Sequence, residues 1–140
     1  KYVNSSNNTV MNTTNKFWGR NYRGLERANI CSRGIRTYGA PAEGNDIGQL
    51  LGEALTFRAI YYADLVKAWG DVVARFQPIS SETMYLAKSS RDVIYKQILA
   101  DLSEASKLVA WPKGNARTQT AEGINRAFVK AFHARLCLAA

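Results

Sequence analysis

The chain has 140 residues, 46% of them hydrophobic, and a formal net charge of +8. This length and apolar content suit one globular domain with a single core, and exclude a disordered polar chain. No run approaches the roughly 18 uninterrupted apolar residues that a membrane-spanning helix needs, and the first residues lack a secretory signal pattern. The sequence does not begin with Met, and residues 127–140 still follow a helical pattern where it ends. We therefore expect a fragment of a longer protein.

The basic charge invites a nucleic-acid interpretation, because clustered Lys and Arg gain affinity by releasing counterions from phosphates. One concentrated group exists, formed by Arg20, Arg23, Arg27, Arg33 and Arg36. The other basic residues are scattered among acids, which favours a solvated basic face and no nucleic-acid partner.

Cys31 and Cys137 lie far apart and neither belongs to a CxxC motif. No zinc or redox site is therefore predicted. Two buried free thiols are the simplest interpretation, and a disulfide stays open.

The first part of the chain divides into a polar segment and a helix. Residues 1–14 are rich in Asn, Ser and Thr, which favour turns, and we predict an irregular segment there. From Asn15 onward an apolar stripe recurs at helical spacing, with Thr14 or Asn15 as N-cap. The stripe consists of Trp18, Tyr22, Leu25 and Asn29. The glycine-rich stretch at 32–48 then predicts a long irregular loop.

Residues 47–69 form the most informative predicted helix. One apolar stripe contains Leu50, Ala54, Phe57, Tyr61 and Leu65, and a second beside it contains Leu51, Leu55, Tyr62, Val66 and Trp69. A helix that is apolar over so much of its circumference must be packed on more than one side. We therefore expect an interior helix, which ends at Gly70.

Two further helices are predicted in the second half. Ser89, with Asp92 three residues later, indicates a capping box that opens a helix at about 91–109, and Thr120 is the expected cap of the last helix. About ten residues join these two helices, which favours an antiparallel hairpin. The chain is thus predicted to be all-α, a tetratricopeptide-like stack of about four antiparallel helices with a long loop after the first.

The sequence contains no recognisable catalytic motif, and we predict no enzyme, cofactor or metal site. A glycosidase needs two carboxylates about 5–9.5 Å apart. Glu53 and Asp64 share a helix face but are separated by roughly 16 Å along it. Asp101 and Glu104 are closer, yet they lie on the polar side of an amphipathic helix. His133 has no Ser or Cys in a nucleophile context.

Four segments, in this order, resemble the SusD/RagB family of nutrient-binding proteins. The sequence WGRNYRGLERAN at 18–29 is similar to the family's first helix, and GEALTFRAIYYADLVKAWGDV at 52–72 is the stronger match. Tyr95, Ile98, Asp101, Leu102 and Ala105 resemble its third helix, and Arg117, Thr118, Ala131, Arg135 and Leu138 its fourth. Val73 stands where proline is usual, and His133 and Cys137 also depart from the family pattern.

The resemblance implies that residues 15–140 form an incomplete N-terminal helical domain of a bacterial outer-membrane surface lipoprotein, whose lipid anchor is absent from this chain. It implies a polysaccharide or oligosaccharide ligand and a SusC-like TonB-dependent transporter as partner. The matched residues are expected to be mainly structural, through packing or internal ion pairs. They are Trp18, Tyr22, Asn29, Glu53, Arg58, Tyr62, Trp69, Asp71, Asp101, Arg117 and Arg135.

Glycan contact is expected from loops, because a sugar ring needs an exposed aromatic beside polar donors and acceptors. The loop after the first helix offers Arg36, Tyr38 and Asn45, which we predict to bind ligand. The alternative is that Tyr38 is an ordinary loop residue that contacts no ligand. A second function also stays open, a protein-interaction scaffold without sugar binding in this fragment.

Overall fold

The computed structural model describes residues 17–140 and confirms an all-α architecture. Four α-helices occupy this range: α2 (Phe17–Tyr38), α3 (Asp46–Trp69), α4 (Arg91–Leu108) and α5 (Arg126–Ala139). A short 3-10 helix, η1 (Ala116–Thr118), precedes α5. The irregular segment predicted at 1–14 and the cap predicted at Thr14 or Asn15 lie outside the described residues.

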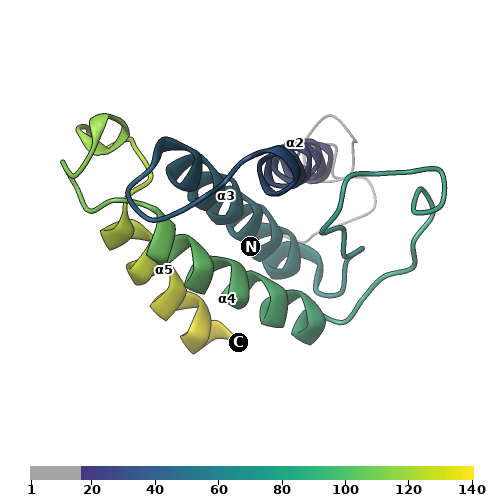
Figure 1. Ribbon diagram of the computed structural model, residues 1–140. Helices are drawn as coiled ribbons and strands as arrows, with labels where there is room; N and C mark the ends of the chain where they lie inside the picture. Colours follow the sequence, from purple (N-terminus) through teal and green to yellow (C-terminus); the bar gives the residue numbers. More distant parts are fainter. Residues whose placement is uncertain (1–16) are drawn as a thin grey trace.

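The helices pack in chain order, so that α3 lies between α2 and α4 while α5 lies beyond α4 (Figure 1). Neighbouring helices run in opposite directions. Trp18 near the start of α2 contacts Trp69 at the end of α3, and the amide of Arg126 at the start of α5 donates to the carbonyl of Ala110 just after α4. The predicted antiparallel stack is therefore confirmed.

Helix α3 is the interior helix that its two apolar stripes predict. Fourteen of its 24 residues are buried, and Leu55, Ala59, Tyr62 and Leu65 are completely inaccessible. Gly52 permits α4 to approach closely, because a Cβ there would lie 2.6 Å from Cγ1 of Val109. None of the helices within residues 17–140 is long and apolar enough to cross a membrane.

The predicted loop at 32–48 is wrong in its first part, because α2 continues to Tyr38 and only residues 39–45 link it to α3. Glycine costs about 1 kcal/mol in a helix interior, which made Gly34 look like a break. Tertiary contacts outweigh that cost. Ser32 is buried, Ile35 packs against the core and Arg36 pairs with Glu104 of α4.

Helix α4 begins at Arg91, as predicted, but its cap is one residue later than the predicted Ser89. The cap is Ser90, whose hydroxyl accepts from the amide of Val93, whereas the amide of Ser89 donates to the carbonyl of Val72. That backbone bond joins the two ends of the connecting segment, residues 70–90, and removes Ser89 from the helix.

The last helix also begins later than predicted, with Asn125 and not Thr120 as its cap. Residues 119–125 instead form turns beside η1. Gly123 lies so close to Arg117 that a Cβ would sit 2.2 Å from its carbonyl oxygen. The lack of a side chain at Gly123 thus permits this close contact with η1.

A buried polar network connects the first three helices. The guanidinium of Arg58 on α3 forms two hydrogen bonds with the carboxylate of Asp101 on α4, at 2.7 and 2.8 Å. A third donation, at 3.1 Å, reaches the side-chain oxygen of Asn29 on α2. The side chains of Arg58 and Asp101 are only 7% and 3% exposed. Gln97 completes the carboxylate's shell with a further donation at 3.0 Å.

Breaking this pair is expected to destabilise the protein strongly. Asp101→Asn leaves the Arg58 guanidinium buried without a counter-charge, which costs about 3–5 kcal/mol in comparable sites. Urea unfolding measures the change in the free energy of unfolding. Glu104→Gln is the matched control, because it breaks the exposed Arg36–Glu104 pair of similar geometry and is expected to cost about 1 kcal/mol or less. Equal effects of the two substitutions would contradict this account.

Candidate functional site

The connecting segment between α3 and α4 is held against α2 by side chains that bond to its backbone. Hydroxyl, amide and guanidinium donors on α2 and α3 reach three carbonyls of the segment. They are Tyr22 to Val73 at 2.8 Å, Asn29 to Arg75 at 2.9 Å, Tyr62 to Arg75 at 2.7 Å and Arg58 to Phe76 at 3.1 Å. In the opposite sense, the carboxylate of Glu26 accepts from the amide of Ile79, at 3.0 and 3.2 Å. An irregular segment thus acquires a defined path over the helix.

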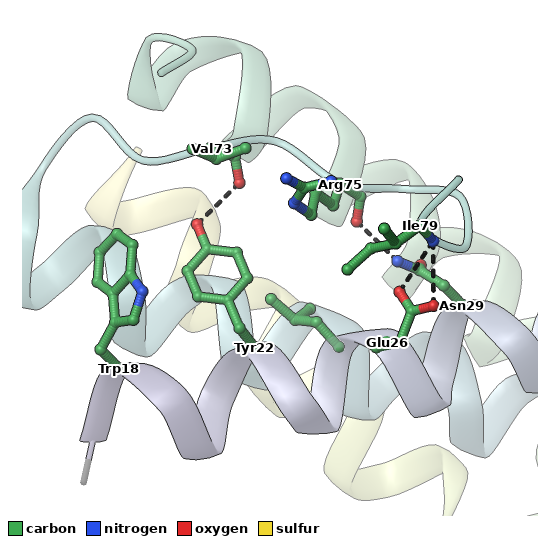
Figure 2. A pocket seen from close by; sticks show the side chains of 8 residues that line it. Trp18, Tyr22, Glu26, Asn29, Val73, Arg75 and Ile79 are labelled. Atoms are coloured by element: carbon green, nitrogen blue, oxygen red, sulfur yellow. Dashed lines mark hydrogen bonds between the residues drawn. The ribbon is translucent and has the colours of Figure 1, made fainter. Parts of the chain in front are cut away.

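A pocket of about 260 Å³ lies where this segment crosses α2 (Figure 2). We call it the aromatic pocket. Its lining comes from one face of α2 and from the near side of the segment: Trp18, Tyr22, Leu25, Glu26, Asn29, Val73, Arg75 and Ile79. In Figure 2 the rings of Trp18 and Tyr22 stand side by side on the helix, and Arg75 and Ile79 face them from the segment.

The aromatic pocket combines apolar ring surface with a few polar groups. The rings of Trp18 and Tyr22 are 4.8 Å apart at 47°, and Trp69 supports Trp18 edge-on at 5.0 Å. Glu26 and Arg75 contribute opposite charges at the other end. The guanidinium of Arg75 donates to the carbonyls of Thr83 and Met84, which orders the next part of the segment. Such a surface suits a ligand with an apolar face and a polar rim.

Burial changes the acidity of two tyrosines beside this pocket. It raises the pKa of Tyr22 to about 12 and also raises the pKa of Tyr62, because ionisation would place a phenolate where water is scarce. Both hydroxyls are therefore neutral donors at physiological pH, which the bonds to Val73 and Arg75 require.

The three residues predicted to bind ligand are not gathered into one loop site. Arg36 lies in the last turn of α2, where it pairs with Glu104 at 2.7 Å and this interaction raises its pKa. Tyr38 ends the helix and is 91% exposed. The side chain of Asn45 caps α3 by accepting from Gly48 at 2.6 Å and donates to Ala40 at 2.9 Å. Ligand contact by these residues stays a prediction.

Most residues matched to the family motif take part in packing or internal bonds. Beyond the Arg58 network, Arg117 of η1 donates to both carboxylate oxygens of Glu53 on α3, at 2.9 and 3.1 Å. Asp71 accepts from the amide of Arg91, a favourable place for an anion because the N-terminal end of a helix carries partial positive charge. Arg135 on α5 is exposed and forms no ion pair with the described residues.

The two cysteines of the chain lie in α2 and α5. Cys31 and Cys137 are free thiols, but both are exposed, so the expectation that they are buried is wrong. Residues 17–140 contain no group of three or more His, Cys, Asp or Glu that could hold a metal ion.

The connecting segment is the part of the candidate site that sequence reasoning missed. None of the residues predicted to bind ligand lies in it, although it supplies Val73, Arg75 and Ile79 to the aromatic pocket and exposes Tyr85 by 93%. A signal was present, because Tyr85 is an aromatic residue in a polar, irregular stretch, the same argument that singled out Tyr38. The contribution of Glu26 had no sequence signal, since it depends on where Ile79 lies.

The chain belongs to the SusD-like family. Residues 1–138 match a family model described as "Starch-binding associating with outer membrane". No curated protein sequence matches the chain.

Several solved structures share the fold. A laminarin-binding SusD-like protein superimposes with a TM-score of 0.77 at 23% identity, covering 94% of this chain and 27% of that protein. A SusD-like carbohydrate-binding protein from Bacteroides fragilis gives 0.73 at 20% identity, covering 93% and 25%. Surface glycan-binding protein A from Bacteroides fluxus gives 0.71 at 22% identity, covering 87% and 25%. This chain therefore spans about a quarter of the length of these similar proteins.

The raised tyrosine pKa values predict a loss of stability in alkali. A neutral tyrosine is favoured in the folded state, so its contribution is complete below the unfolded pKa of about 10 and is lost as the pH rises through about 12. The free energy of unfolding should fall over this range, and less steeply in Tyr22→Phe. Tyrosinate absorbance should show a late ionisation that this variant partly removes and that the urea-unfolded chain lacks. A folded-state titration identical to that of the unfolded chain would contradict the burial of these hydroxyls.

Proposed function

We propose that residues 15–140 are the N-terminal helical part of a surface lipoprotein that binds an extracellular glycan at a bacterial outer membrane. The family match over residues 1–138 carries this proposal, since the family is described as starch-binding and associated with the outer membrane. The names of several proteins with the same fold also refer to glycan or carbohydrate binding.

The aromatic pocket supports the proposal chemically. Trp18 and Tyr22 offer ring faces to the C–H side of a sugar, while Glu26 and Arg75 offer an acceptor and donors to its hydroxyls. Glu26 is the one carboxylate among the residues that line this pocket. Cleavage of a glycosidic bond requires two, so binding without hydrolysis is the function we propose.

The bound glycan would then pass to a SusC-like TonB-dependent transporter. A stack of helices presents a broad, rigid surface to a partner, and stacked helical repeats commonly serve as binding scaffolds. In this proposal α2 and the connecting segment contribute to ligand contact, and another part of the helical surface contacts the transporter.

The alternative is a protein-interaction scaffold in which this helical part does not bind sugar. The outer face of α5 favours it, because Leu138 is 90% exposed and Phe128 is 41% exposed. Exposed apolar side chains on one helix face are typical of contact with another protein surface.

Binding of the full-length protein to a panel of polysaccharides tests these functions. Affinity electrophoresis should find at least one glycan that binds saturably, with confirmation by calorimetry. Tyr85→Ala should weaken that binding by about tenfold if the segment presents its aromatic ring to the sugar. Tyr38→Ala is the matched comparison, since it removes an equally exposed tyrosine from the end of α2.

If only Tyr38→Ala loses glycan binding, the sugar contacts the site predicted from the sequence and not the connecting segment. Absence of binding to every glycan, together with retained capture of the transporter, would replace the proposal by the scaffold alternative.

A further inference from the structure

A second pocket, separate from the aromatic pocket in its lining, opens between the C-terminal half of α2 and the middle of α4. We call it the α2–α4 pocket. It has a volume of about 280 Å³, and polar and charged side chains dominate its lining: Ser32, Arg33, Arg36, Arg58, Phe76, Gln77, Gln97, Ala100, Asp101 and Glu104. This volume lies just below the roughly 300–1,000 Å³ of pockets for drug-sized ligands, so it suits a single sugar unit.

The floor of the α2–α4 pocket is rigid. Arg58 and Asp101 are both nearly inaccessible and hold each other by two hydrogen bonds, and the ring of Phe76 lies 5.2 Å from the Arg58 guanidinium carbon. Ser32, also buried, directs its hydroxyl to the carbonyl of Asn29. A ligand entering the pocket would therefore meet side chains whose positions are already set, which reduces the entropic cost of binding.

The rim carries the groups that remain available to a ligand. Arg36 and Glu104 pair across it, and the carboxylate of Glu104 keeps lone pairs that can accept from a hydroxyl. Gln77 offers a side-chain amide with no hydrogen bond to another described residue, and the side-chain oxygen of Gln97 is likewise unpaired while its nitrogen donates to Asp101. Acceptors and donors of this kind match the hydroxyls of a sugar.

The charges around the pocket do not cancel. Arg58 is neutralised by Asp101, and Arg36 by Glu104, whereas Arg33 has no ion-pair partner among the described residues. One positive charge is thus in surplus at the rim. A guanidinium binds carboxylates and tetrahedral oxyanions through paired N–H groups, which makes this position suitable for one negative charge on the ligand.

We propose that the α2–α4 pocket binds one anionic sugar unit, a uronate or a sulfate ester, with its negative charge on Arg33 and its hydroxyls on Gln77, Gln97 and Glu104. This inference rests on the proposed glycan-binding function and narrows its substrate class to acidic polysaccharides. It also gives Arg36 a role, that of holding Glu104 in place, which differs from the loop contact predicted from the sequence.

Calorimetry on the full-length protein tests the inference with pairs of probes that differ only at the charged group. One pair is an oligogalacturonide and its fully methyl-esterified form, and the other is a sulfated galactan oligosaccharide and its desulfated form. At least one acidic probe should bind about tenfold more tightly than its neutral counterpart, and the difference should shrink as salt is added. The pair that shows the preference identifies the source of the charge.

Arg33→Gln should abolish the preference for the acidic probe. Arg20→Gln is the matched control, because it removes an equally exposed arginine of α2 that does not line the pocket. Retained preference in Arg33→Gln, or an equal loss in Arg20→Gln, would overturn the inference.

The two proposals fail differently. Equal affinity for acidic and neutral probes would reject the anionic site and leave glycan binding intact. Failure of every probe and of every polysaccharide in the panel would remove both.

Discussion

The contact between Arg58 and Asp101 is the constraint on which the rest of this structure depends. Two charges removed from water must be matched in geometry as well as in sign, or their desolvation is not offset. Arg58 meets that condition with Asp101, Asn29 and the carbonyl of Phe76, and so fixes α2, α4 and the connecting segment relative to α3. Apolar packing alone would hold these helices together with far less specific alignment.

Both candidate ligand pockets follow from that alignment, although they open on different sides of the connecting segment. The aromatic pocket exists because Tyr22, Glu26 and Asn29 hold the segment over α2. The α2–α4 pocket uses the Arg58–Asp101 pair itself as its floor. The chain belongs to a family described as starch-binding. In this chain, one network of hydrogen bonds orders two surfaces of different polarity. The first is suited to ring faces, and the second to a charged or hydroxylated group.

Helix α2 illustrates how tertiary contacts overrule local signals. Gly34 and the following Arg-Thr-Tyr-Gly stretch predict an early end of this helix, yet the helix continues to Tyr38. The extension changes the surface of the protein, because it turns Arg33 and Arg36 from loop residues into one wall of a pocket. Gly24 itself is explained by packing, since a Cβ there would lie 2.6 Å from the ring of Tyr61.

The sequence by itself determined the all-α class, the interior position of residues 47–69 and the family, because helical periodicity and motif spacing involve residues that are close along the chain. Only the tertiary structure decided which partners the buried charges have, how far α2 extends and which residues line each pocket. Arg58 and Asp101 are 43 positions apart, and Glu26 and Ile79 are 53 apart. No local pattern specifies such pairs, because they form only when distant segments meet around a shared core.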